Sequence, residues 1–122
     1  MLASLSAIDV INLLIALTTI GLGICGWLWP RWTMEQLDMR SGPSNMAYTE
    51  VSAVSGCLFV GLGLGAIILN EPMAWLVMGL AYGGAAVGRV TSILRDNAAT
   101  RQSWTFFAVE AGLAAWLVLA NS

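Results

Sequence analysis

The sequence has no lysine and no histidine, and charged residues make up only 10% of its 122 positions. A soluble domain is typically about one-quarter charged, so this shortage of charge excludes an ordinary soluble fold. Without histidine, the chain lacks the usual protein ligand for haem iron, for zinc and for the magnesium of chlorophyll-type pigments. We therefore expect no metal site and no cofactor. The formal net charge of −2 also gives no reason to expect a nucleic-acid partner.

Hydrophobic residues dominate instead, at 58% of the chain, with a mean hydropathy of +0.79. Four apolar runs are separated by short polar links, and each is long enough to cross a bilayer core at about 1.5 Å per residue. The runs cover residues 8–29, 46–69, 73–94 and 104–120. We predict an all-α integral membrane protein, an antiparallel bundle of four transmembrane helices that forms a single domain over 1–122.

Glycine is frequent inside the runs, with 13 in the chain. The stretch from Gly21 to Gly26 has the spacing GxGxxG, but a dinucleotide site needs a strand before it, and here the stretch lies within a predicted helix. Small residues four positions apart let membrane helices approach closely. Three such pairs predict helix–helix contacts: Gly61/Gly65, Gly79/Gly83 and Gly84/Gly88.

Tryptophan is placed near the ends of the runs, as expected for side chains at the headgroup level. We expect these interfacial anchors to be Trp27, Trp29, Trp32, Trp75, Trp104 and Trp116. Residues 31–40 have two interpretations, a short interfacial helix or a solvated loop. In the helical interpretation Trp32, Met34, Leu37 and Met39 face the lipid.

The arginines are distributed unevenly over the links. Arg31, Arg40, Arg95 and Arg101 all fall in the links 30–45 and 95–103, and the opposite side of the predicted bundle has no basic residue. Because cytoplasmic loops are enriched in Lys and Arg, both links are predicted to be cytoplasmic and both termini periplasmic in a cell inner membrane.

Three runs each carry one charge at a similar depth. Glu50 lies six residues after Ser44, Arg89 six residues before Arg95 and Glu110 six residues after Trp104, so each is about 9 Å by helix rise below the predicted cytoplasmic boundary. We predict a cluster in which one or both carboxylates lie within hydrogen-bonding or ion-pair distance of Arg89, with Tyr82 on the same helical face as the arginine. The cluster has two interpretations: a satisfied network that fixes helix register, or a site for a proton, an ion or a polar headgroup.

The chain resembles a widespread bacterial family of small four-helix membrane proteins of unknown function, broadly similar to DoxX-like proteins. The resembling positions are, in chain order, Pro30, Glu50 to Ala53, Gly56, Gly88-Arg89, Ser92, Asp96 and Glu110. In that family an Arg and a Tyr-Gly-Gly stretch follow the glutamate of the second helix, where this chain has Ser52, Ser55 and Cys57. The resemblance implies the four-helix fold and the charged cluster, and no assigned activity.

Three function classes follow from these observations. An enzyme is disfavoured, because no His–Ser, His–Cys or metal-ligand set is present. We predict a non-catalytic accessory or scaffold subunit that packs against a larger membrane complex, such as a respiratory or photosynthetic assembly. Its expected partners are membrane lipids and other integral membrane subunits, with any pigment or quinone contacted by packing alone. The alternative is a small transporter or a lipid- or quinone-binding protein that uses Glu50, Arg89 and Glu110.

Overall fold

A computed structural model describes residues 5–122 of the chain, and in that range it is all-helical without strands. Four helices are long and apolar enough to cross a membrane: Ala7–Leu28, Met46–Leu69, Pro72–Arg95 and Arg101–Asn121. These correspond to the four apolar runs, so the prediction of an all-helical chain with four helices long and apolar enough to cross a membrane is confirmed. A short fifth helix, Pro30–Gln36, lies between the first two.

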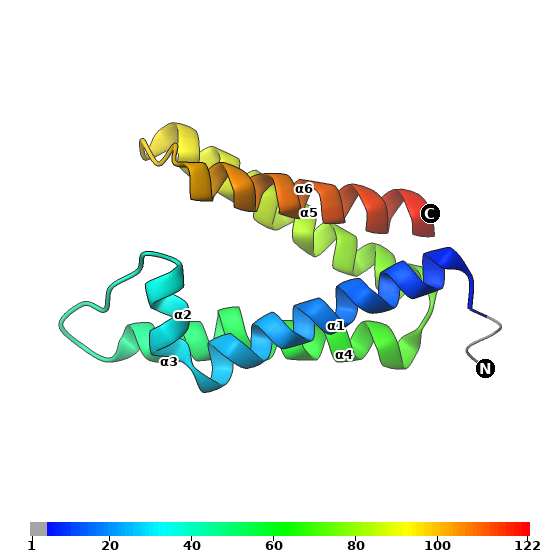
Figure 1. Ribbon diagram of the computed structural model, residues 1–122, viewed down its shortest axis with the longest axis horizontal. Helices are drawn as coiled ribbons and strands as arrows, with labels where there is room; N and C mark the ends of the chain where they lie inside the picture. Colours follow the sequence, from blue (N-terminus) through cyan, green and yellow to red (C-terminus); the bar gives the residue numbers. More distant parts are fainter. Residues whose placement is uncertain (1–4) are drawn as a thin grey trace. The chain divides into compact units, whose positions relative to one another are not determined.

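The chain divides into two compact units, each of which contains two of the long helices. The first unit extends to Ile68 and contains α1 (Ala7–Leu28), α2 (Pro30–Gln36) and all but the last residue of the continuous helix Met46–Leu69. The second unit, Leu69–Ser122, contains α5 (Pro72–Arg95) and α6 (Arg101–Asn121). Within each unit the long helices run antiparallel (Figure 1). The single bundle of all four helices stays a prediction.

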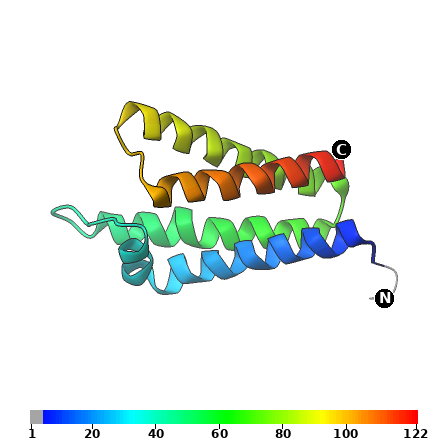
Figure 2. The ribbon, with the colours of Figure 1, turned by 45° about the horizontal axis from the view of Figure 1, so that its top comes forward.

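In the first unit, one face of α1 is buried against the second long helix. Its buried residues recur at helical spacing and are Asn12, Ile15, Ala16, Thr19, Gly23 and Gly26. At Gly23 an added Cβ atom would lie 2.6 Å from the carbonyl oxygen of Gly56, and at Gly63 it would lie 2.9 Å from that of Ala16. These pairs of positions fix an antiparallel register with nearly touching backbones, as Figure 2 shows from a second angle. Within the Gly21–Gly26 stretch, Gly23 and Gly26 are thus packing positions, whereas Gly21 is exposed.

The second long helix is built from three segments: α3 (Met46–Ser52), a π-helical turn η2 (Ala53–Cys57) and α4 (Leu58–Leu69). The backbone amide of Met46 donates to the hydroxyl of Ser44 at 3.2 Å, so Ser44 supports the first helical residue. The helix ends before Asn70, whose φ of 45° is left-handed. Pro72 then takes the first turn of α5, where its missing N–H is harmless.

In the second unit, α5 and α6 form a tight hairpin. An added Cβ atom at Gly79 would lie 2.8 Å from the Cβ atom of Leu117, and one at Gly83 would lie 3.7 Å from that of Ala114. The hairpin turn uses Asn97 in a left-handed conformation with φ 54°. This register brings the loop-proximal halves of the two helices together and so positions the charged pair described next.

Candidate functional site

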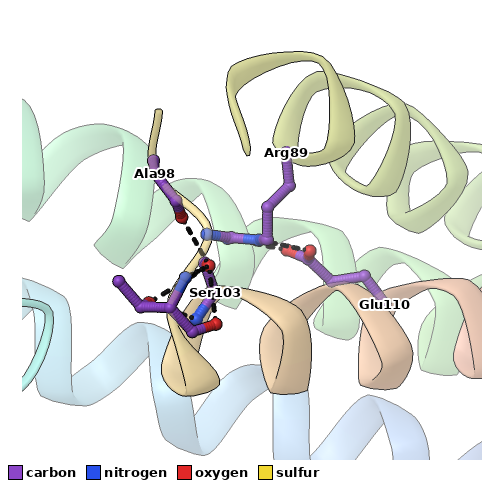
Figure 3. A network of polar contacts seen from close by, with 5 residues as sticks. Arg89, Ala98, Ser103 and Glu110 are labelled. Atoms are coloured by element: carbon purple, nitrogen blue, oxygen red, sulfur yellow. Dashed lines mark hydrogen bonds and ion pairs between the residues drawn. The ribbon is translucent and has the colours of Figure 1, made fainter. Parts of the chain in front are cut away.

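Arg89 and Glu110 form a two-pronged ion pair between α5 and α6 (Figure 3). The Nε of Arg89 donates to Oε1 of Glu110 at 2.6 Å, and Nη2 donates to Oε2 at 2.9 Å. This side-on fork is the geometry in which guanidinium and carboxylate bind most strongly. The side chain of Arg89 is 35% exposed and that of Glu110 16%, so both charges lie partly inside the hairpin. The structure thus brings together two of the three charges that the sequence places at one depth.

Phe106 covers the same guanidinium. The centre of its ring lies 5.1 Å from the Cζ atom of Arg89. Phe106 is one helical turn before Glu110, so both side chains project from one face of α6. A cation over an aromatic ring gains roughly 0.5–2 kcal/mol, depending on desolvation. Sequence reasoning missed Phe106, although its spacing of four residues from Glu110 was a usable signal.

Ser103 fixes the start of α6 two turns before Glu110. The side chain of Thr100 accepts a hydrogen bond from the Ser103 amide at 3.0 Å, and the Ser103 hydroxyl accepts one from the Thr100 amide at 2.9 Å. The Ser103 hydroxyl also lies 2.7 Å from the carbonyl oxygen of Ala98 (Figure 3). This reciprocal cap satisfies two amides that a helix otherwise leaves unpaired. It also begins α6 at Arg101, three residues earlier than the apolar run suggests.

At the other end of the turn, Asp96 closes α5. Its carboxylate accepts hydrogen bonds from Nε and Nη2 of Arg95 at 2.8 and 2.7 Å, and from the Ser92 hydroxyl at 2.8 Å. The Arg95 guanidinium and, after it, the Ser92 hydroxyl lower the pKa of the Asp96 carboxyl to about 2. Arg95 is therefore neutralised by its neighbour.

The third member of the predicted cluster, Glu50, lies on α3 in the first unit and is exposed. Its pairing with Arg89 stays a prediction. Tyr82 lies on α5 two turns before Arg89, on the same helical face, and is partly buried. The chemistry visible within the second unit is therefore that of a neutral Arg89–Glu110 pair with an aromatic cover.

The closest helix contacts fall on different glycines from most of those predicted. Around Gly61, Gly65, Gly84 and Gly88, no other helix of the same unit lies within 4 Å of an added Cβ atom. Only the Gly79/Gly83 pair faces a neighbouring helix. The reason is rotation about the helix axis: at about 100° per residue, Gly84 points well away from Gly83. Small-residue spacing identifies a smooth helix face without saying which face meets the partner.

The π-helical turn was not predicted from the sequence. It lies where the two helices of the first unit are closest: an added Cβ atom at Gly56 would lie 2.6 Å from the Trp27 amide nitrogen. The hydroxyl of Ser52 donates to the Trp27 carbonyl at 3.3 Å. Gly56 and Gly63 are seven residues apart, about two helical turns, and both face α1.

Four of the six expected tryptophan anchors are exposed, with Trp27, Trp29, Trp32 and Trp104 between 43% and 56% accessible. Trp75 departs from the expectation, because it is 5% exposed and buried within the chain. Trp116 is partly buried.

Residues 31–40 include a helix, as one interpretation expected, but it spans only Pro30–Gln36. Met34, expected to face lipid, is 3% exposed and packs inward. Arg31 lies over the ring of Tyr48, with Cζ 4.2 Å from the ring centre, and so links the start of α2 to α3. A left-handed Asp38, with φ 56°, ends the segment.

The described chain is a small all-helical protein, and its four long apolar helices are consistent with a multi-pass membrane protein. The chain belongs to a family built on a domain of unknown function, DUF4345, whose model matches residues 8–121. Neither the curated proteins nor the solved structures contain a match to the chain.

Proposed function

We propose that this chain is a non-catalytic accessory or scaffold subunit of a larger membrane complex, with a respiratory or photosynthetic assembly as its host. The observation that carries the proposal is the closed Arg89–Glu110 pair. Both oxygens of Glu110 are held by the guanidinium, so the carboxylate serves to hold α5 against α6. A charge pair of this kind specifies helix register, which is a structural task.

The outer surface of the hairpins supports a role based on packing. Large apolar side chains are exposed on each of the four long helices, for example Leu14, Ile68, Val87 and Leu119 at 56%, 76%, 65% and 75%. Along α6, a shallow apolar hollow is lined by Gly112, Ala115, Trp116, Leu119 and Ala120. Such a hollow can accept a side chain from a partner helix. We propose that partner subunits contact this face of α6.

The proposal also includes the orientation of the chain in the membrane and its relationship to other small membrane proteins. The arginines of the links 30–45 and 95–103 support a cytoplasmic location for both links in a bacterial inner membrane, with both termini periplasmic. The DoxX-like resemblance supports an ancestry shared with other small four-helix membrane proteins.

A small transporter is less well supported. Transport of a proton or a cation through the hairpin would need a carboxylate that can release its partner, and Glu110 is bound on both oxygens. The paired carboxylate therefore favours the subunit role.

Purification of the tagged protein from its native membrane in a mild detergent, followed by mass spectrometry, tests the subunit role. We expect stable co-purification of larger membrane proteins. Gly112→Leu fills the hollow on α6 and should reduce their recovery several-fold. Gly84→Leu is the matched control, because it adds the same side chain at an open glycine outside the hollow. A protein that purifies alone, as a small oligomer, contradicts the proposal.

A further inference from the structure

The Arg89 guanidinium has a second donor edge that the ion pair leaves unused. A guanidinium carries five N–H groups, and its two-pronged bond to Glu110 takes one from Nε and one from Nη2. The two protons of Nη1 and the second proton of Nη2 remain. Among residues 5–122, the hydrogen bonds of this side chain are the two to Glu110, and Nη1 makes none. The Nη1–Nη2 edge is itself a fork that matches two oxygens of one anion.

This free edge points toward the loop end of the hairpin. The guanidinium lies over Phe106, which is one turn nearer to the loop than Glu110. Figure 3 shows the group extending away from Glu110 toward the end that carries Ala98 and Ser103. Arg89 is six residues before the last residue of α5, or about 9 Å along the axis.

The surroundings decide what the edge can bind. In a membrane, water does not reliably satisfy a donor at this depth, so an unpaired N–H is unfavourable. Phe106 blocks one face of the guanidinium, so a ligand has to approach in the plane of the group. Arginine binds phosphate oxygens in this plane with two parallel hydrogen bonds. Phosphate groups are also concentrated at the headgroup level that the edge faces.

We propose that the Nη1–Nη2 edge of Arg89 binds a phosphate group, carried by an anionic lipid headgroup or present as free phosphate. Glu110 orients the guanidinium from the side, and Phe106 holds its plane. The 35% exposure of the Arg89 side chain gives the phosphate access. The inference goes beyond the subunit role and does not depend on it.

Native mass spectrometry of the full chain in a neutral detergent tests the site. Phosphatidylglycerol is titrated against diacylglycerol with the same acyl chains, which lacks the phosphate. We expect the wild type to bind one molecule of phosphatidylglycerol in preference to diacylglycerol. Arg89→Lys keeps the charge but loses the fork of donors, so it should bind phosphatidylglycerol about tenfold more weakly. Arg31→Lys is the matched control and should bind like the wild type. Inorganic phosphate at millimolar concentration separates the sources: displacement assigns free phosphate, and retention of the lipid assigns the headgroup.

Glu110→Gln separates binding from folding. The side-chain oxygen of the glutamine can still accept a hydrogen bond from Arg89 and so keep the guanidinium in place, while the neutralising charge is removed. The variant should therefore bind phosphatidylglycerol at least as tightly as the wild type. Equal binding by wild type and Arg89→Lys would overturn the proposal. Loss of binding in both Arg89→Lys and Glu110→Gln would also overturn it, because binding would then follow hairpin packing. A gain of lipid binding in Glu50→Gln would show that Glu50 occupies the Nη1–Nη2 edge of Arg89, and this result would also overturn the proposal.

Discussion

At the scale of single residues, Arg89 and Glu110 are stabilising only as a pair. Arg89→Ala leaves a carboxylate inside a membrane span without its partner, and such a loss costs roughly 3–5 kcal/mol in fully buried pairs. Here we expect about 1–2 kcal/mol, because the arginine is one-third exposed and polar contacts in membranes are worth less. The measurement is the free energy of unfolding in mixed micelles, followed by tryptophan fluorescence.

Arg31→Ala is the control for that change, because it removes an exposed arginine at the start of α2 and should cost less than Arg89→Ala. Glu110→Gln should partly rescue Arg89→Gln, since the double variant has no unpaired charge. Equal costs for Arg31→Ala and Arg89→Ala, without rescue in the double variant, would show that the pair is not a structural unit.

Asn97 is a second residue whose role is local. Its left-handed φ of 54° lets the Ala98 amide reach back to the Ile93 carbonyl at 3.2 Å and so ends α5. We expect Asn97→Gly to be neutral, while Asn97→Val should destabilise the hairpin by about 1–2 kcal/mol because a β-branched residue is strained there. Ala99→Val, in the same loop and without a positive φ, is the matched control in thermal unfolding.

The third residue prediction concerns pH. The pKa of Asp96 is lowered to about 2, so its contribution to stability is complete above the ordinary carboxyl pKa of about 3.9 and is lost as pH falls toward 2. The wild type should therefore be more stable than Asp96→Asn at neutral pH, and the difference should shrink between about pH 4 and pH 2. Unfolding of both proteins across this range measures it. A difference that stays constant down to pH 2 would contradict the assignment.

At the scale of elements, hydropathy predicts the four long helices well because each must satisfy its own backbone in lipid. Predicted bounds of 46–69 and 73–94 compare with observed helices Met46–Leu69 and Pro72–Arg95. The predicted start of α6 at Trp104 is three residues later than the observed start at Arg101, because the residues of the Thr100–Ser103 cap are polar and hydropathy does not detect them. The π-helical turn Ala53–Cys57 could not be predicted, because it lies at a contact with α1, a helix that is distant in the sequence.

Two neighbouring glycines of α5 give a sharp test of helix packing. Gly79→Ala places a Cβ atom 2.8 Å from the Cβ atom of Leu117, which cannot move without shifting α6, so the hairpin should lose stability by about 1–3 kcal/mol. Gly84→Ala enters open space and should be neutral or stabilising by up to about 1 kcal/mol, since alanine favours helix. Thermal unfolding of both variants in the same detergent measures this difference in stability. The reverse order would mean that Gly84 faces the helix contact.

At the scale of the whole molecule, part of the candidate site was predictable and part was not. A charge in a membrane span needs a counter-charge, and equal depth on successive antiparallel helices makes Glu110 a candidate partner for Arg89. The same argument ranks Glu50 equally, because depth says nothing about rotation around the helix axis. Acidic residues at equal depth differ in the direction of their side chains around the helix axis. That direction depends on helix contacts that cannot be read from the spacing of residues in the sequence.

The distribution of arginine over the links gives a prediction for the entire chain. Since Arg31, Arg40, Arg95 and Arg101 all lie in the two larger links, these links should stay in the cytoplasm and the C-terminus should be periplasmic. Cysteine labelling can test this once the free thiols Cys25 and Cys57 are replaced, the latter being exposed. Suitable new positions are Gly42, which has open space around it, and Ser122, which is exposed beyond α6.

An impermeant maleimide added to intact spheroplasts should label Ser122→Cys at once and Gly42→Cys only after the membrane is opened. This pattern follows because an even number of crossings returns both ends of the chain to one side, while the arginine-rich links stay on the other. Replacing Arg31 and Arg40 with glutamine weakens the charge bias and should produce a fraction of molecules with Gly42→Cys accessible from outside. Labelling of Gly42→Cys in intact spheroplasts of the otherwise unchanged protein would reverse the topology and remove the charge argument.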